Sequence, residues 1–417
     1  MKIIRKINAF GLRLGEQTVE PELTYVINPC VIKYESAWYN PMTGEAVLVE
    51  DLKPDMKQLI QKWFYVPKCL DIKTIAHWVR QKTLTSSMGP GSALKTSYTI
   101  FTTTSCNASC NYCFEKNYKN ISMSDQVAED VAKYIIKTRN TSTTLTIKWF
   151  GGEPLVNTRA IDIISEHLNK NLIPFRSSIT TNGDLLDRVS DSTIVNTWKL
   201  KEVQLTLDDV GSEYGVFKGL DSGAYDRLKK QIIRLSDLGV HISVRIHFHP
   251  EIGLEPCFRV VDDLKGIQNV SMYGRIIYNS DSIENYNKLL ELEEYIKKYG
   301  KYSYPFPRRG SGIHCMADNR HISCITPLGE LSPCEHYPYG EVYGSIYDGV
   351  TDPEMLAEWR IKEKHLSTDC DTCQLYPLCE KLTMCPAEGK CSDGYQYYQI
   401  ETIKRALRKK VEEVNDN

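Results

Sequence analysis

Fourteen cysteines in a chain of 417 residues constrain this sequence more than any other feature. Cys30, Cys69 and Cys257 stand apart and are interpreted as ordinary half-buried thiols. The others form two sets, the first being Cys106, Cys110 and Cys113, and the second Cys315, Cys324, Cys334, Cys370, Cys373, Cys379, Cys385 and Cys391. We expect a cytoplasmic protein, because the opening residues lack the apolar stretch of a secretory signal. Disulfides are then a poor explanation, and the grouping predicts thiolate metal sites.

Composition and charge narrow the class of protein further. The length suggests two or three domains of ~150 residues each. Hydrophobic residues make up 41% and charged residues 25%, which is typical of a globular protein. No apolar run approaches the ~18 residues that a membrane span needs, so no membrane partner is expected. The formal net charge of -2 gives no electrostatic argument for binding nucleic acid.

Three stretches differ in composition and in their expected secondary structure, and they predict three domains. Residues 1–92 are expected to form a small α+β domain, residues 93–308 an α/β domain, and residues 309–417 a cysteine-rich domain that ends in a polar helix from about 395 to 415. In the first stretch we expect strands at 24–28, 30–40 and 45–49, helices around 56–64 and 75–84, and a linker at 86–92. The expected strand at 45–49 follows the turn signal Asn40-Pro41-Met42-Thr43-Gly44.

Six strands alternate with helices in the central stretch. The strands are expected at 98–103, 145–150, 177–181, 203–208, 242–248 and 270–277, with helices such as 126–139, 159–169 and 224–238 between them. This order predicts a parallel sheet, open or curled into a partial (β/α)6 barrel. Alternation along the fifth strand places Arg245, His247 and His249 opposite its apolar face. A polar lumen is typical of a binding cavity rather than a filled core.

The first cysteine set has the spacing C-x3-C-x2-C and follows directly on the first of these strands. Three thiolates on one short loop can ligate three irons of a [4Fe-4S] cluster and leave the fourth iron without a protein ligand. Structural zinc is the alternative, but it prefers four protein ligands. The loop resembles the signature of the radical S-adenosylmethionine (SAM) enzymes, in which an aromatic residue, here Tyr112, precedes the last cysteine.

Three further motifs agree with this resemblance: Gly151-Gly152-Glu153-Pro154 after the second strand, Thr180-Thr181-Asn182-Gly183 after the third, and Leu205-Thr206-Leu207-Asp208 ending the fourth. In the family the first lies against the methionyl amino group of SAM. Its glycines let backbone carbonyls approach an ammonium, and Glu153 can fix the loop or add charge. The resemblance makes Tyr112, Asn182, Thr206 and Asp208 candidate SAM contacts, with Thr206 at a position that touches the ribose. Capping of a strand end is the alternative for Thr206 and Asp208.

The methionyl carboxylate of SAM needs a cation or a hydrogen-bond donor. Arg245 is our first choice, because alternation turns it toward the lumen, and a buried ion pair is the alternative. His247 and His249 form an H-x-H pair that could bind a metal ion. With no carboxylate motif attached to them, we interpret these histidines as polar lining of the lumen.

The second cysteine set resembles the SPASM domain, which holds auxiliary clusters in radical SAM enzymes that act on peptides and proteins. The pattern begins with Cys315, runs through Gly329-x4-Cys334, and continues as Cys370-x2-Cys373-x5-Cys379. It departs from the family at Cys385, which follows after five residues instead of three. Family analogy assigns one [4Fe-4S] cluster to Cys315, Cys324, Cys334 and Cys385, and another to Cys370, Cys373, Cys379 and Cys391. A zinc ribbon is the alternative.

The resemblance implies an enzyme with three [4Fe-4S] clusters, SAM and an electron donor such as flavodoxin or ferredoxin. A reduced cluster would cleave SAM, and the resulting 5'-deoxyadenosyl radical would abstract hydrogen from the substrate. We expect a maturase that installs a thioether or carbon-carbon cross-link in a ribosomal precursor peptide. A sulfatase-maturating enzyme that forms formylglycine is the first alternative. A non-enzymatic Fe-S electron carrier is the second, and the SAM-binding motifs argue against it.

Two further expectations concern substrate handling. The element order of residues 1–92 resembles the small winged-helix domains that bind leader peptides in many peptide maturases, and a structural cap is the alternative. Glu335 directly follows Cys334, where sulfatase maturases carry an Asp thought to deprotonate the substrate. Glu335 is therefore a candidate catalytic base, with a surface or hydrogen-bonding role as the alternative.

Overall fold

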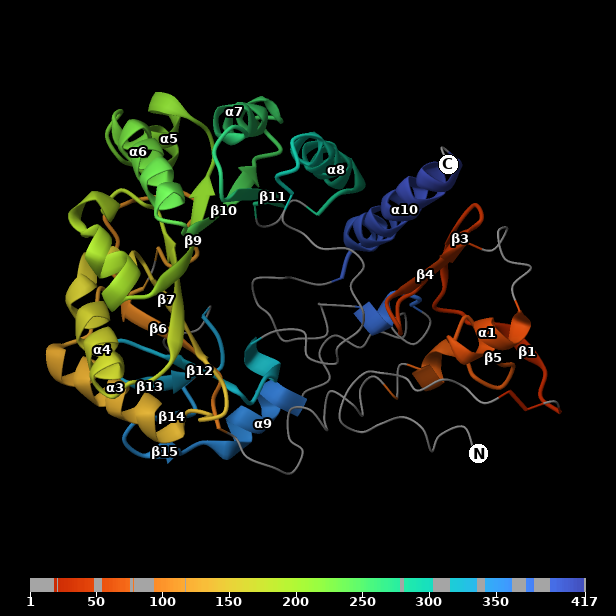
Figure 1. Ribbon diagram of the computed structural model, residues 1–417, viewed down its shortest axis with the longest axis horizontal. Coiled ribbons are helices and arrows are strands. Elements are labelled where there is room, and N and C mark those ends of the chain that lie inside the picture. The colour runs from red at the N-terminus through yellow and green to blue at the C-terminus, as the bar shows by residue number, and fades with distance from the viewer. Residues whose placement is uncertain are drawn as a thin grey trace.

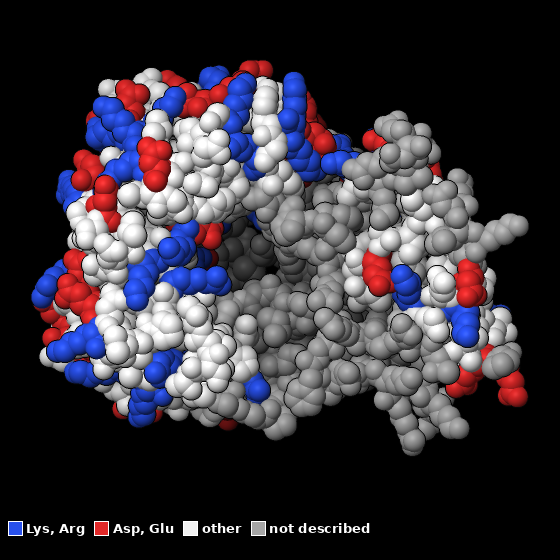
Figure 2. Space-filling view, viewed as in Figure 1, with Lys and Arg blue, Asp and Glu red and all other residues white. Residues whose placement is uncertain are grey.

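The computed structural model describes residues 19–20, 22–48, 55–75, 78, 94–116, 118–277, 281–302, 316–335, 342–361, 373–378 and 391–415. A large twisted sheet carries helices along its outer side (Figure 1). The N-terminal strands lie on the other side of the molecule, next to helix α10. Figure 2 shows this face hollowed near its centre, with both basic and acidic side chains on the barrel side of the hollow.

Six parallel strands form the larger part of the sheet, from one of its edges inward, as the sequence predicted. They are β6 Ser97–Thr103, β7 Leu145–Gly151, β8 Phe175–Thr181, β9 Leu200–Leu207, β10 His241–Phe248 and β11 Val270–Ile276. Each strand pairs in parallel with the next one along the chain. The predicted partial (β/α)6 barrel is confirmed, and the carboxyl ends of all six strands meet at one edge.

Helices follow the strands and cover their outer face. They are α3 Asp125–Thr138, α4 Thr158–Lys170, α5 Gly211–Lys218, α6 Ala224–Asp237, α7 Glu255–Leu264 and α8 Ile283–Lys298. Short turns, η2 Pro154–Asn157, η3 Leu186–Arg188 and η4 Thr193–Thr197, complete the connections after β7 and β8. Side-chain caps fix several helix starts; Ser124, for example, accepts the backbone N–H of Val127. Helices α3, α4 and α6 confirm the three helices that the sequence analysis named as examples, and α5, α7 and α8 were not among those named.

The predicted alternation of apolar and polar residues also holds in the strands. On β10, Val244, Ile246 and Phe248 are fully buried in the main core, while Arg245 and His247 stay partly accessible on the other face. Because successive side chains of a strand point to opposite faces, the polar set turns toward the inside of the barrel.

The described C-terminal residues extend the same sheet, which the sequence did not predict. Strand β12 Ile322–Ile325 pairs in parallel with β6, and β13 Glu330–Ser332, β14 Gly344–Ser345 and β15 Gly349–Val350 follow as antiparallel neighbours. Helix α9 Pro353–Ile361 and the turns η5 Met316–Asp318 and η7 Tyr376–Leu378 lie in the same part of the sequence. The strands are too short for a period of two residues to be recognised in the sequence.

The N-terminal elements form two small antiparallel sheets. Strand β1 Tyr25–Ile27 pairs with β5 Tyr65–Pro67, and β2 Ile32–Tyr34, β3 Ala37–Asn40 and β4 Glu45–Leu48 form a meander. The single strand predicted at 30–40 is wrong, because Glu35 takes a left-handed conformation (φ 47°) and turns the chain. Helix α1 Met56–Gln61 ends before the predicted 64, since the chain enters β5. The predicted helix at 75–84 and linker at 86–92 lie almost wholly outside the described residues.

Helix α10 Asp393–Asn415 confirms the predicted polar helix and joins two parts of the fold (Figure 1). Its Ile403, Leu407 and Val411 pack on the N-terminal strands at Ile32, Ala37 and Tyr39. Nearer its start, Tyr395 and Tyr398 pack on helix α8 at the edge of the barrel. Among the described helices, none has the length and apolar character that crossing a membrane would require.

Candidate active site

The three-cysteine loop leaves strand β6 at the carboxyl edge of the sheet. Cys106 is exposed, and Cys110 and Cys113 are half-buried. A turn in which the Cys113 N–H donates to the Cys110 carbonyl (3.2 Å) brings the two cysteines together. The pKa of the Cys106 thiol is raised chiefly by partial desolvation, and Cys110 and Cys113 act in the same direction. Three neighbouring thiols on one loop fit a [4Fe-4S] cluster that keeps one iron open.

Gly151 and Gly152 pack directly against the start of the cysteine loop. A Cβ added to Gly151 would lie 2.0 Å from the Thr103 carbonyl oxygen, and one added to Gly152 would lie 2.5 Å from that of Thr104. The Gly152 N–H also donates to the Thr103 carbonyl at 3.1 Å. The structure therefore shows a reason for these glycines that the sequence did not reveal, namely backbone-to-backbone contact with the loop.

Glu153 is fully buried and ties the exits of β7 and β8 together. Its Oε1 accepts from the Leu155 N–H (3.0 Å) and the Thr181 hydroxyl (2.7 Å), and its Oε2 accepts from the Asn182 N–H (2.7 Å). Burial raises the pKa of this carboxyl to about 7, and the three hydrogen bonds oppose that shift. Of the two roles considered from the sequence, fixing the loop is the one these contacts perform.

Asn182 reaches the cysteine loop from the end of β8. Its side-chain Nδ2 donates to the Asn107 Oδ1 at 2.8 Å, and the Tyr214 hydroxyl donates to its backbone carbonyl at 2.8 Å. The candidate SAM contacts at Gly151, Gly152, Glu153 and Asn182 thus lie around the start of the cysteine loop.

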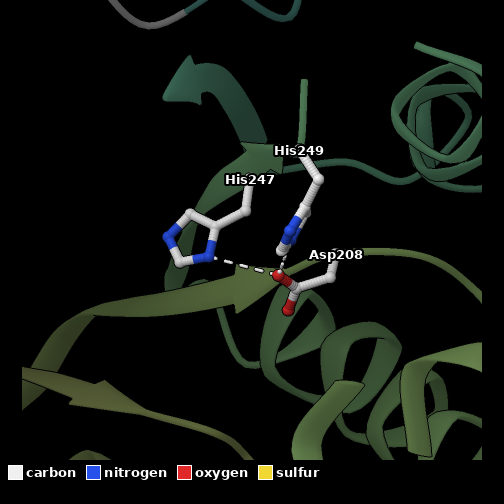
Figure 3. Close-up of side chains that lie close together, drawn as sticks. All are labelled: Asp208, His247 and His249. Atoms are coloured by element: carbon white, nitrogen blue, oxygen red, sulfur yellow. Dashed lines mark hydrogen bonds and ion pairs between the residues drawn. The ribbon is translucent and has the colours of Figure 1, made fainter. Parts of the chain in front are cut away.

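Asp208 is the centre of a buried cluster at the ends of β9 and β10 (Figure 3). Its Oδ1 accepts from the His249 Nε2 (2.8 Å) and the His247 Nδ1 (3.2 Å). Its Oδ2 accepts from the Tyr112 hydroxyl (2.6 Å) and pairs with the Lys218 Nζ (3.0 Å). The two predicted SAM contacts Tyr112 and Asp208 therefore bond to each other.

Electrostatics keep this cluster charged at Asp208 and neutral at His247. Burial opposes ionisation of Asp208, but Lys218 and the two histidine hydrogen bonds outweigh it and hold its pKa far below the usual range. Burial lowers the pKa of His247 to about 4, Asp208 opposes this, and Lys218 and Arg245 add to it. Both histidines were predicted as lumen lining, and the carboxylate beside them comes from the neighbouring strand.

Arg245 on β10 pairs in register with Thr206 on β9. Each lies two residues before a member of the cluster, His247 and Asp208 respectively. The Arg245 Nε donates to the Tyr273 hydroxyl at 3.1 Å, and Arg275 lies 5.3 Å from the Tyr273 ring centre. The barrel wall formed by β9 to β11 therefore carries two arginines, and Arg245 faces the lumen as the sequence predicted.

Two cysteines of the C-terminal set lie near each other, Cys324 on β12 and Cys334 just after β13. Cys324 pairs in register with Ser332, two residues before Cys334, and both thiols are buried. Glu335 follows, and its Oε2 accepts from the Lys148 Nζ of β7 at 2.7 Å. Cys373 packs beside the N-terminal strands, and Cys391 precedes α10. Cys315, Cys370, Cys379 and Cys385 lie outside the described residues.

Two residues of this region were not found from the sequence. Lys218 ends α5 before the left-handed Gly219, so its position reads as an ordinary helix terminus. Glu115 follows Cys113 by two residues; burial, Glu335 and Glu153 together raise its pKa to about 8. No local pattern marks either residue, because their neighbours come from distant parts of the chain.

A parallel sheet of six strands with three cysteines on the loop after its first strand defines the radical SAM class of enzymes. The model of the radical SAM superfamily matches residues 100–264. The radical SAM cyclopropyl synthase TigE of Paramaledivibacter caminithermalis is 33% identical over 344 residues, which are 68% of this chain and 67% of TigE. The chain therefore belongs to the radical SAM superfamily, whose enzymes use a [4Fe-4S] cluster and SAM.

Solved structures share the fold at low sequence identity. The structure of anSMEcpe with bound AdoMet and Cp18Cys peptide superposes with a TM-score of 0.54 at 17% identity, covering 76% of this chain and 99% of that one. Streptococcus suis SuiB bound to its precursor peptide SuiA gives a TM-score of 0.54 at 13% identity, covering 88% of this chain and 95% of that one.

Proposed function

We propose that this enzyme is a peptide maturase that installs a thioether or carbon-carbon cross-link in a ribosomal precursor peptide. The observation that carries the proposal is the extent of the structural likeness to SuiB, which covers 88% of this chain. The structure of SuiB has been solved with its precursor peptide. The sequence similarity to TigE, also a radical SAM enzyme, spans 68% of the chain and supports the same class.

The residues at the carboxyl edge of the sheet fit the tasks that this chemistry sets. Cys106, Cys110 and Cys113 would hold the cluster, and Arg245 is the cation for the methionyl carboxylate of SAM. When bound, the cluster and SAM supply a 5'-deoxyadenosyl radical that abstracts hydrogen from an unactivated carbon. The lumen must then hold the target C–H in place and exclude water and stray hydrogen donors.

The C-terminal set is proposed to hold two auxiliary [4Fe-4S] clusters, for three in all. Cys315, Cys324, Cys334 and Cys385 would ligate one, and Cys370, Cys373, Cys379 and Cys391 the other. The closeness of Cys334 to Cys324, which pairs with Ser332 two residues before it, supports the first group. An electron donor such as flavodoxin or ferredoxin would deliver the electrons.

Glu335 is proposed as the base that takes a substrate proton beside the first auxiliary cluster. Its place directly after Cys334 supports the proposal. Its ion-pair partner Lys148 lies on β7, a strand of the same sheet that contains β13. The ion pair is half-buried, with 30% of the Lys148 side chain and 21% of the Glu335 side chain exposed, so a substrate can reach it. A thiol that loses an electron must also lose a proton, and an adjacent carboxylate couples the two losses.

The N-terminal meander is proposed to bind the leader of the precursor peptide. Strand β4 pairs with β3 on one side, and among the described strands no other pairs with it. An extended peptide can add to such an edge through backbone hydrogen bonds.

The test is anaerobic reconstitution with SAM, a reductant and the short peptide encoded next to the enzyme, followed by mass spectrometry. A loss of 2 Da without involvement of sulfur indicates a carbon-carbon link, whereas a loss of 2 Da that blocks a cysteine thiol indicates a thioether. The chain with all three loop cysteines replaced by Ala is the control. SAM cleavage without any change in the peptide would count against the proposal.

Sulfatase maturation is the second candidate, favoured by the likeness to anSMEcpe over 99% of that chain. A sulfatase-derived peptide with a cysteine at the modified position distinguishes the two, because conversion to formylglycine changes its mass and creates an aldehyde. Aldehyde formation together with an unchanged neighbouring precursor would favour this candidate.

A further inference from the structure

A buried hydrogen-bond network lies behind the cysteine loop and joins two candidate SAM contacts, Tyr112 and Asp208, to residues with no task in the function proposed above. We call Asp208, Lys218, Tyr112, His247 and His249 the Asp208 hub. Both members of its ion pair are buried, since 0% of the Asp208 side chain and 4% of the Lys218 side chain are exposed. A buried pair of charges is costly to form, so it needs a reason.

The hub is saturated from within the protein. Each carboxylate oxygen of Asp208 has two donors, and the Lys218 Nζ also donates to the Tyr112 hydroxyl at 2.8 Å. Two histidines and one carboxylate could ligate a divalent cation, and their ligand atoms lie within 4.8 Å of one another. The Lys218 ammonium, however, already neutralises Asp208, and a divalent cation beside it would be repelled.

The hub is attached to the cysteine loop at two points. Tyr112 carries the hydroxyl that bonds to both Asp208 and Lys218, and it directly precedes Cys113. The Lys218 carbonyl accepts from the Ser109 N–H at 2.8 Å, directly before Cys110. Gly219 lies so close to Ser109 that a Cβ would be 2.0 Å from the Ser109 Oγ. The last turn of α5 therefore holds the loop next to two of its three cysteines.

We propose that Lys218 and Asp208 are positioning residues that fix the cysteine loop through Tyr112 and balance the charge beside the cluster it holds. The inference rests on the cluster of the radical SAM family and not on the identity of the peptide substrate. A cluster on three thiolates becomes more negative on reduction, so the Lys218 cation favours the reduced state and the Asp208 carboxylate opposes it.

The test is a double-mutant cycle read by a redox titration of the holoenzyme. The variants are Lys218→Met, Asp208→Asn and the two combined, and the signal is the part of the electron paramagnetic resonance spectrum that changes when SAM is added. A unit charge acting over ~10 Å at an effective dielectric constant of ~20 shifts a reduced-to-oxidised ratio roughly tenfold. We expect Lys218→Met to lower the ratio at a fixed potential and Asp208→Asn to raise it, while the combined variant returns to within about twofold of the wild type.

Matched variants separate charge from general damage. Lys218→Arg keeps the cation and should stay near the wild-type ratio. Lys229→Met removes the lysine of the ion pair with Asp263, which joins α6 and α7 on the outer face of the barrel, and should not change the ratio. Shifts in the same direction for both hub variants, or no shift in folded hub variants, would overturn the proposal.

Two further measurements test the proposal if Lys218→Met or Asp208→Asn fails to fold. Tyr112→Phe removes only the hydroxyl that joins the hub to the loop, and we expect iron release to a chelator to accelerate at least ~5-fold. Tyr225→Phe is its control, because the Tyr225 hydroxyl donates to Asp263 at the same 2.6 Å. Equal release from the two variants contradicts the proposed link. Zinc, added alone, is tested on the variant that lacks the three loop cysteines. If this variant binds one equivalent of zinc, and His247→Ala abolishes that binding, the hub is a metal site and the proposal is overturned.

Discussion

Replacing Gly152 by Ala is expected to disturb the cysteine loop through a single methyl group. The added Cβ would lie 2.5 Å from the Thr104 carbonyl oxygen and 2.7 Å from that of Ser105. Ordinary contacts begin near 3.4 Å, so the backbone leading into Cys106 must move by most of an ångström. Both obstacles are backbone atoms, which cannot swing aside as a flexible side chain would.

A displacement of this size matters because the loop positions the reacting groups. A misplacement of about 1 Å can cost ~100-fold in rate, and overpacking costs about 1–3 kcal/mol of stability. We therefore expect Gly152→Ala to form 5'-deoxyadenosine ~100-fold more slowly than the wild type. The assay is chromatography of SAM cleavage products after anaerobic reconstitution, with iron content measured in the same samples.

Gly266→Ala is the matched control for this experiment. No atom lies within 4 Å of the Cβ position at Gly266, so the same chemical change is made without an obstacle. The control should cleave SAM at the wild-type rate. If Gly152→Ala also does so with full iron content, the close contact between Gly152 and the loop has no functional weight and the reasoning is refuted.

Three other predictions follow from the proposed clusters and domains. Replacing the three loop cysteines by Ala should lower the iron content from about 12 to about 8 atoms per chain and abolish SAM cleavage, and zinc in place of the remaining iron would contradict the auxiliary clusters. Cys373→Ala should reduce product formation more than it reduces uncoupled SAM cleavage. Deleting residues 1–88 should weaken binding of the precursor, measured by calorimetry, and leave SAM cleavage intact, whereas normal binding would make this region a cap. Glu335→Gln should reduce product at least ~100-fold with cluster content and uncoupled cleavage unchanged, and unchanged turnover would return Glu335 to a structural role.

The sequence predicted those features of the fold that repeat locally. The six barrel strands were located to within three residues at their ends, because alternation and turn signals recur along each of them. The strand predicted at 30–40 failed at Glu35, whose left-handed conformation leaves no compositional signal. Strands β12 to β15 were missed because they are two to four residues long and depend on pairing with β6 and with each other.

The candidate site divides in the same way. The cysteine loop and the motifs after the next three strands are short, contiguous patterns, and the carboxyl edge of a parallel sheet brings them together. Lys218 and Tyr112 are 106 residues apart, and Lys148 and Glu335 are 187 apart. Contacts at such separations depend on the packing of whole elements, so the chain offers no local sign of them.

The contact between α10 and the N-terminal strands also sets the order in which the chain can be completed. The Arg408 Nε donates to the Tyr34 hydroxyl across 374 residues, at the polar margin of the contact where Leu407 packs with Ala37 and Tyr39. During synthesis the meander is made long before α10, and its apolar face lacks this helix until α10 has left the ribosome. Nascent chains and chains truncated before α10 therefore expose this face to chaperones and proteases.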